Sequence, residues 1–209
     1  MRALITARFP DHGILGEEHG HAVGRSEWEW VLDPIDGTRG FVSGFPTWGT
    51  IVGLRHRDVA VLGLVDQPWT QERWLGYPGH ASFVDRLGQR PIRTRPCARL
   101  ADAVLSTTSP EVFQTAAEKT VLAAFQAATR LRRYGGDCYA YALLAAGQID
   151  LVVECGLYPY DVVGVIPIIE AAGGVVTTWD GGDAGQGGAI VAAGDARVHG
   201  EALRVLRGG

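Results

Sequence analysis

Hydrophobic and polar positions follow different patterns in the two halves of the chain. Between Trp48 and Phe83, short runs of β-branched and aromatic residues are separated by turn signals, which predicts an antiparallel meander. Residues 28–33 alternate in the same way and predict a strand that carries Asp33 at its end. Beyond Leu100, strand-like and helix-like segments alternate regularly, which is typical of an α/β layer.

Start and stop signals divide the chain into a definite set of elements. The predicted helices are residues 2–8, 38–43, 110–127, 138–147 (with Asp137 as its N-cap), 161–172 and 196–206. The predicted strands are 28–33, 50–55, 59–67, 72–77, 81–84, 103–109, 130–136, 149–154, 174–179 and 189–194. We expect a single domain over residues 1–209, with a β-meander lobe (1–100) that carries the metal motifs and an α/β lobe (101–209).

Composition and charge exclude several classes of protein. The 209 residues carry a net charge of −4 without a basic run, which argues against a nucleic-acid or membrane partner. There is no apolar segment long enough to cross a membrane and no signal-peptide core. The three cysteines, Cys97, Cys138 and Cys155, form no paired motif, so we expect free thiols and a cytoplasmic location.

Three acidic clusters are the strongest candidates for chemistry. They are Glu17-Glu18, the hexapeptide 33–38 (DPIDGT) and Asp161. Hard carboxylate ligands without His or Cys suit Mg²⁺, and backbone amides at a helix start suit a phosphate. Together the clusters predict metal-assisted phosphate chemistry. Taken singly, acids in such positions are more often a surface charge, a turn residue or an N-cap than part of a metal site.

These motifs resemble the inositol monophosphatase family of Mg²⁺-dependent, lithium-sensitive phosphatases. The resemblance rests on GEE (16–18), WVLDPIDGT (30–38) and YDVVGVIPIIEAAGG (160–174), and it extends from about Ile5 to about Arg204. Segments 47–76 and 133–161 are most similar to the histidinol-phosphate phosphatase branch. The resemblance implies the layered αβαβα sandwich of the sugar phosphatases, an α+β fold. Family members normally begin with two further helices that cover the sheet, so we expect an open apolar face here and therefore a homodimer.

The resemblance also assigns roles to individual residues. Glu17 would be a shared metal ligand that helps to hold the attacking water, Asp33 would bridge two metals, and Thr38 would orient the water. The implied ligands of two to three Mg²⁺ ions are Glu17, Asp33, Asp36, Asp161 and the carbonyl of Ile35. The implied substrate-binding residues are Ile35, Asp36, Gly37, Thr38, Gly135, Gly136, Asp137, Glu154 and Asp161.

Two of these acids, Asp137 and Glu154, remain after the metal ligands are assigned. Histidinol phosphate offers them an ammonium and an imidazole, and a carboxylate binds a cation more strongly than a neutral hydroxyl. We therefore expect hydrolysis of L-histidinol phosphate to L-histidinol and phosphate, a step of histidine biosynthesis. The alternatives are an inositol or other sugar-phosphate phosphatase, and an inactive phosphate-binding or scaffold protein.

Overall fold

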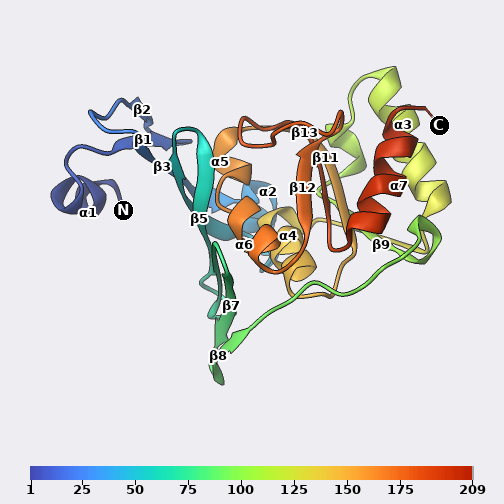
Figure 1. Ribbon diagram of the computed structural model, residues 1–209, viewed down its shortest axis with the longest axis horizontal. Coiled ribbons are helices and arrows are strands. Elements are labelled where there is room, and N and C mark those ends of the chain that lie inside the picture. The colour runs from blue at the N-terminus through green and yellow to red at the C-terminus, as the bar shows by residue number, and fades with distance from the viewer. Residues whose placement is uncertain (209) are drawn as a thin grey trace.

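The computed structural model describes residues 1–208, which form layers of helices and sheets (Figure 1). The first sheet has eight strands in the order β2-β1-β3-β4-β5-β6-β7-β8, and the second has five in the order β10-β9-β11-β13-β12. Helices α4, α5 and α6 lie between the two sheets, α3 and α7 cover the outer face of the second, and α1 lies beyond the first (Figure 1). The expected αβαβα sandwich is confirmed.

The bounds of the elements are as follows. The first sheet contains β1 (Gly13–Gly16), β2 (Gly20–Ala22), β3 (Trp28–Asp36), β4 (Gly49–His56), β5 (Val59–Gln67), β6 (Glu72–Tyr77), β7 (His80–Asp85) and β8 (Gly88–Pro91). The second contains β9 (Val104–Thr107), β10 (Leu131–Tyr134), β11 (Leu151–Leu157), β12 (Val175–Thr178) and β13 (Gly188–Ala193). The helices are α1 (Arg2–Arg8), α2 (Thr38–Ser43), α3 (Ala116–Ala128), α4 (Asp137–Ala145), α5 (Pro159–Val162), α6 (Ile166–Ala171) and α7 (Ala196–Leu206). Two 3₁₀ turns are η1 (Leu100–Asp102) and η2 (Pro110–Val112).

The predicted meander is confirmed, because β4 to β8 pair antiparallel with their neighbours in chain order. The structure adds β1, β2 and β8, which the residue pattern did not indicate. The helix predicted from residue 110 was wrong at its start. Thr115 accepts a hydrogen bond from the Glu118 amide, and the Glu118 carboxylate accepts one from the Thr115 amide. This capping box begins α3 at Ala116, after the separate turn η2.

The single helix predicted over residues 161–172 is two short helices, α5 and α6. Pro167 is near the start of α6. Because proline has no amide hydrogen and its ring crowds the carbonyl four residues earlier, a continuous helix cannot pass through this point. The break at 163–165 leaves the backbone around Gly164 free to approach the first sheet.

That approach depends on a row of glycines across three strands. Gly53, Gly63 and Gly76 are opposite one another in β4, β5 and β6. A Cβ atom on Gly53 would lie 2.7 Å from a methyl carbon of Val163, and one on Gly63 would overlap the Gly164 carbonyl oxygen. The missing side chains therefore let the α5–α6 segment lie directly on the sheet.

The opposite face of the first sheet presents apolar side chains. Leu32, Val52, Leu64 and Leu75 are cross-strand neighbours on this face, and the last three are only partly buried. Within residues 1–208, α1 is the one helix on this side (Figure 1), and none of its residues is buried. The resemblance predicts an open apolar face, and this row of mostly half-buried apolar side chains is the candidate for it.

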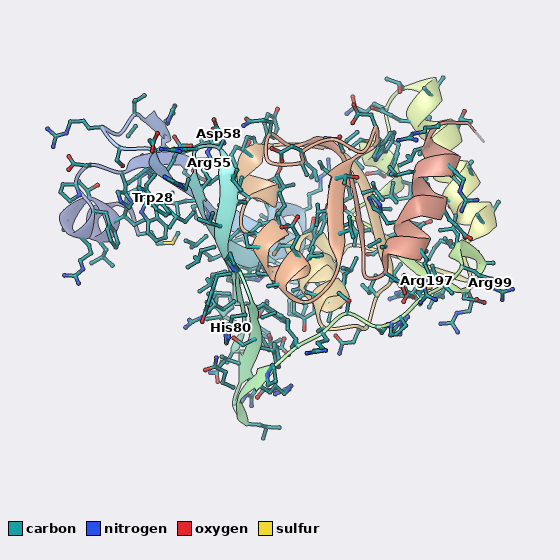
Figure 2. All side chains as sticks on the ribbon, in the orientation of Figure 1. Trp28, Arg55, Asp58, His80, Arg99 and Arg197 are labelled. Atoms are coloured by element: carbon teal, nitrogen blue, oxygen red, sulfur yellow. The ribbon has the colours of Figure 1, made fainter. Side chains whose placement is uncertain are left out.

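The segment between the lobes is held by acidic side chains of the second lobe. Both carboxylate oxygens of the buried Asp150 accept hydrogen bonds from Arg95, at 2.5 and 2.6 Å. Asp195 accepts the Cys97 amide (3.0 Å) and pairs with Arg197, which is labelled in Figure 2. The connector is thus fixed to the second lobe. None of the helices in residues 1–208 is long and apolar enough to cross a bilayer.

Replacing Gly63 by alanine tests the glycine row. A side chain there forces the α5–α6 segment away from the sheet, so we expect the free energy of unfolding to fall by about 3 kcal/mol or more. In Gly200→Ala, the matched control, the new methyl group is in the middle of α7 and meets nothing within 4 Å. That change replaces a glycine inside a helix, where glycine is unfavourable. We therefore expect the free energy of unfolding to rise by up to ~1 kcal/mol. Urea denaturation measures both; equal stability of Gly63→Ala and the wild type would contradict the role of the row.

We propose that two chains associate through the apolar face that contains Leu64. Burying apolar surface drives association, and a two-fold axis would pack the face on its own copy. Sedimentation velocity at micromolar concentration should show a dimer. Leu64→Lys should shift the protein towards monomer, whereas Leu87→Lys, at a fully solvated turn position (92% exposed), should not. A well-folded wild-type monomer would rule the dimer out.

Candidate active site

Three carboxylates from distant parts of the chain meet beside the first sheet. Asp33 and Asp36 are at the end of β3, and Asp161 is in α5. Each offers an oxygen atom, and these oxygens all lie within 4.8 Å of one another. In residues 1–208 this is the one group of three or more His, Cys, Asp or Glu side chains with such geometry. Asp33, Asp36 and Asp161 are called the acidic triplet below.

The triplet is electrostatically unfavourable as it stands. Burial, followed by the charges of Asp36 and Glu17, raises the pKa of Asp33 to about 9. Burial is also the main reason that the pKa of Asp36 rises to about 8 and that of Asp161 to about 6. No basic side chain of residues 1–208 forms an ion pair with any of the three. One buried and two half-buried carboxylates without a positive partner fit a hard divalent cation such as Mg²⁺.

The turn after Asp33 is held by its own hydrogen bonds. The Asp33 carboxylate accepts the Ile35 amide (3.0 Å), and the Thr38 hydroxyl donates to the Ile35 carbonyl (3.1 Å). Gly37 has φ +83°, and a Cβ atom there would also lie 3.2 Å from Asp137. A non-glycine residue at this position would be strained and crowded. The sequence Asp-Gly-Thr therefore fixes the carbonyl of Ile35 and the start of α2 next to the triplet.

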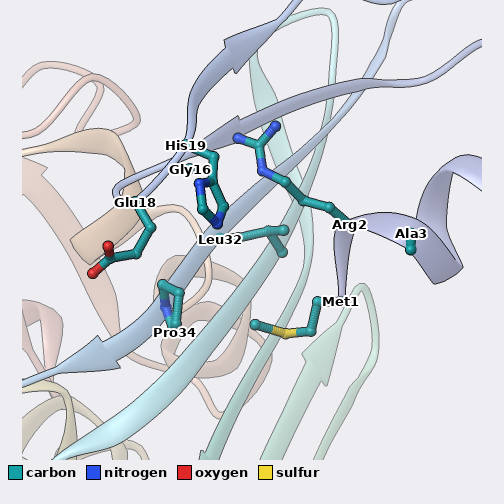
Figure 3. Close-up of a pocket in the computed structure, with 8 residues that line it drawn as sticks. All are labelled: Met1, Arg2, Ala3, Gly16, Glu18, His19, Leu32 and Pro34. Carbon is teal, nitrogen blue, oxygen red and sulfur yellow. The ribbon is translucent and has the colours of Figure 1, made fainter.

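The two neighbouring glutamates of the β1–β2 turn lie differently. Glu17 is exposed, and its amide donates to the Leu32 carbonyl of β3 (3.2 Å). Its charge raises the pKa of both Asp33 and Asp161, so its carboxylate is near the triplet but not within the tight group of three. Glu18 instead lines a cavity of about 360 Å³ with Leu32 and Pro34, beside the first residues of the chain (Figure 3).

A second, acidic cavity adjoins the triplet. It has a volume of about 190 Å³, and the carboxylates that line it are Asp36, Asp137, Glu154 and Asp161. No lysine, arginine or histidine lines it. We call it the acidic cavity. The metal-site candidates and the substrate-contact candidates Asp137 and Glu154 are thus brought together at one place.

Glu154 is the most tightly held of these acids. Its side chain is buried, and its two oxygens accept the Thr108 amide (2.5 Å) and the Tyr141 hydroxyl (3.1 Å). Burial raises the pKa of Glu154 to about 7 in spite of these two donors. The sequence did not single out Thr108 or Tyr141. Tyr141 is four residues after Asp137 in α4, and that spacing on a helix was a signal for it.

Asp137 does not cap α4, so the N-cap interpretation was wrong. The N-cap is Gly136, and no side-chain capping hydrogen bond is formed. Asp137 has φ +44°, a left-handed conformation that is uncommon for a residue with a side chain. Burial raises the pKa of its carboxyl, while Thr108 and Arg39 act in the opposite direction. A strained acid at a cavity is typical of a functional position.

The two glycines before Asp137 shape the loop around the acidic cavity. The Gly135 amide donates to the Thr108 carbonyl (2.8 Å), and Gly135 has φ +81°. A Cβ atom on Gly136 would lie 2.7 Å from that of Ala140. Neither glycine lines the acidic cavity itself, so their direct substrate contact stays a prediction.

The raised pKa values predict how the stability of the metal-free protein depends on pH. An acid whose pKa is higher in the folded state than its ordinary 3.8 binds more protons when folded. Stability therefore falls as the pH rises from about 4 towards 9. Asp33→Asn removes the strongest contributor and should flatten this slope.

Mg²⁺ should restore stability to the wild type at pH 8. A ligand that binds only the folded state adds about 2.7 kcal/mol at 100 times its Kd. Asp33→Asn should lose most of this gain, whereas Asp58→Asn, in an exposed turn, should keep it. Thermal melting with and without Mg²⁺ decides the point; an unchanged Mg²⁺ response in Asp33→Asn would remove Asp33 from the metal site.

The known proteins that this chain resembles include phosphatases. The chain is 42% identical to "Bifunctional phosphatase IMPL2, chloroplastic" of Arabidopsis thaliana, over 99% of this chain and 62% of that protein. It is 32% identical to a histidinol-phosphatase of Mycobacterium tuberculosis, over 100% of this chain and 81% of that protein. The chain therefore spans less than two thirds of the length of the plant relative.

Solved structures show the same fold. An inositol monophosphatase from Zymomonas mobilis has a TM-score of 0.88 and 39% sequence identity, over 99% of this chain and 79% of that one. The model of the inositol monophosphatase family matches residues 1–207. The match covers nearly the whole chain, including the acidic triplet and the acidic cavity, and the chain belongs to the inositol monophosphatase family.

Proposed function

We propose that this protein is a Mg²⁺-dependent phosphomonoesterase that hydrolyses L-histidinol phosphate. The observation that carries the proposal is the acidic cavity, which shares Asp36 and Asp161 with the acidic triplet, adds the carboxylates of Asp137 and Glu154, and has no basic side chain in its lining. A metal-binding triplet suits the phosphate end of a substrate. A cavity with an excess of negative charge suits a leaving group that carries positive charge.

The metal would be held by oxygen atoms alone. The proposed ligands of two to three ions are Glu17, Asp33, Asp36, Asp161 and the carbonyl of Ile35. When bound, Mg²⁺ would neutralise phosphate charge, acidify a water molecule and stabilise the leaving oxygen. The amides of Gly37 and Thr38 open α2 beside these ligands and would donate hydrogen bonds to phosphate oxygens.

The attacking water would be positioned by Thr38 and Glu17. The hydrogen of the Thr38 hydroxyl is engaged by the Ile35 carbonyl (3.1 Å). Its oxygen is therefore free to accept a hydrogen bond but not to donate one. A water molecule that donates to Thr38 and to the Glu17 carboxylate turns a lone pair towards phosphorus, and Glu17 can accept its proton.

The leaving alcohol would be recognised by Asp137 and Glu154. Both oxygens of Glu154 are held by Thr108 and Tyr141, so the carboxylate is fixed before the substrate arrives. Asp137, in its left-handed backbone conformation, also lines the acidic cavity. The ammonium and the imidazole of histidinol phosphate are the groups that these acids would bind. Such a contact is stronger to a cation than to the neutral hydroxyls of a sugar.

This reaction belongs to histidine biosynthesis and fits a reducing, cytoplasmic setting. All three cysteines are free and buried, and burial raises the pKa of the Cys138 and Cys155 thiols. Such thiols are poor nucleophiles. They serve as small packing residues and not as catalysts.

An inositol-phosphate or other sugar-phosphate phosphatase is the alternative activity. The similarity to an inositol monophosphatase of known structure favours it. A phosphate-binding protein without turnover is the alternative of another class. An enzyme of this family would release phosphate in the presence of Mg²⁺, and Li⁺ would inhibit that release. A phosphate-binding protein would release no phosphate.

Asp137→Asn tests the substrate assignment. Asparagine keeps the shape and tolerates the left-handed conformation, so the variant removes charge with little strain. Loss of one charge-assisted contact of ~1.5–3 kcal/mol should lower kcat/KM for histidinol phosphate roughly 10- to 150-fold. The value for inositol 1-phosphate should change much less. Initial-rate assays on both substrates measure the difference.

Asp102→Asn is the matched control, because Asp102 is an exposed acid outside the site. It should leave both values unchanged. Equal losses on the two substrates in Asp137→Asn would leave only a general phosphatase. A wild-type preference for inositol phosphate would reject histidinol phosphate as the substrate.

A further inference from the structure

Helix α4 also lines a cavity on the side away from the acidic one. Cys138 and Tyr141 face the acidic cavity, whereas Tyr139 and Leu143 face a hollow between α4 and the hairpin strands β6 to β8. This second hollow has a volume of about 320 Å³, within the usual range for small-molecule sites. We call it the hairpin cavity. Figure 2 shows the hairpin by its residue His80.

Aromatic rings form the floor and one wall of the hairpin cavity. Trp74 and Phe83 are 1% and 7% exposed, and their ring centres are 4.8 Å apart. The Tyr139 ring stands perpendicular to that of Trp74, with centres 5.3 Å apart. The indole N–H of Trp74 has no hydrogen-bond acceptor in the described part of the chain. The floor is therefore closely packed and nearly closed to solvent, and it holds one unsatisfied donor.

Two uncompensated charges of opposite sign border this floor. Arg93 is exposed and has no carboxylate within ion-pair distance in residues 1–208. Glu72 has no basic partner there; one of its oxygens accepts the Tyr139 hydroxyl (2.6 Å) and the Thr70 hydroxyl (2.7 Å), which fix its position. Arg90, the other basic residue of the lining, is already paired with Asp85 (2.9 Å) and lies over the Phe83 ring.

We propose that the hairpin cavity binds a small zwitterion with a planar ring, that is, a free amino acid with an aromatic or imidazole side chain. The Arg93 guanidinium would bind the carboxylate, for which its planar fork is suited. Glu72 would bind the ammonium through its remaining oxygen. The ring would lie against Tyr139, the partly exposed aromatic side chain of the lining, where an aromatic contact adds to burial.

The proposal is independent of the reaction at the acidic triplet. The two cavities share α4 but no lining residue. Tyr139 lines the hairpin cavity, whereas the preceding residue, Cys138, lines the acidic cavity and donates its amide to Asp36 of the triplet (2.6 Å).

Isothermal titration calorimetry of the full chain tests binding directly. The probes are L-phenylalanine and L-histidine, with L-leucine as a zwitterion without a ring and 3-phenylpropionate and phenethylamine as single-charge analogues. We expect saturable binding of at least one ring-bearing amino acid. Leucine and both analogues should bind at least tenfold more weakly. No saturable binding of either ring-bearing amino acid at millimolar concentration would overturn the proposal.

Substitutions then test which of the two cavities holds the bound ligand. Arg93→Gln and Glu72→Gln should each weaken binding at least tenfold, since each removes one charge and keeps a polar group of similar size. Arg86→Gln, an exposed arginine of the same hairpin outside the cavity lining, should leave the affinity unchanged. Asp137→Asn should also leave it unchanged. Loss of binding in Asp137→Asn with retention in Arg93→Gln would put the ligand in the acidic cavity and overturn the proposal.

Discussion

The contact between the glycine row and the α5–α6 segment is the constraint on which the rest of the structure depends. Three neighbouring strands have no side chain where Gly53, Gly63 and Gly76 stand. The backbone near Gly164 can therefore lie on the sheet itself. Asp161 is three residues before Gly164. The same close approach therefore sets the third acid of the triplet beside Asp33, which is at the end of a strand in that sheet.

Close packing has an electrostatic cost that a bound cation offsets. Burial and mutual repulsion oppose ionisation of the acidic triplet, as its raised pKa values show. Proteins accept such strain at functional sites because the rest of the fold over-determines the position. Here the surrounding hydrogen bonds, such as that from the Cys138 amide to Asp36, hold the carboxylates in place. The fold thus brings together three carboxylates that would serve as a pre-arranged set of ligands for a cation.

Helix α4 separates two environments of different chemistry. On one side it contributes Asp137 and Tyr141 to a cavity with four carboxylates. On the other it contributes Tyr139 and Leu143 to an aromatic cavity with one free cation and one free anion in the described residues. Neighbouring residues of a helix point in different directions. One short helix therefore contributes side chains both to the acidic cavity and to the hairpin cavity.

The sequence by itself determined what is encoded within a few neighbouring residues. Alternation predicted the meander, the DPIDGT turn predicted that Asp33 and Asp36 are close, and the bounds of α7 were confirmed as predicted. Only the tertiary structure decided that Asp137 is strained and that Thr108 and Tyr141 hold Glu154. The reason is the separation along the sequence. The Cys138 amide donates a hydrogen bond to the Asp36 carboxylate, and these two residues are 102 positions apart. Local pattern carries no information on which distant backbone approaches a side chain, because that depends on how the layers pack.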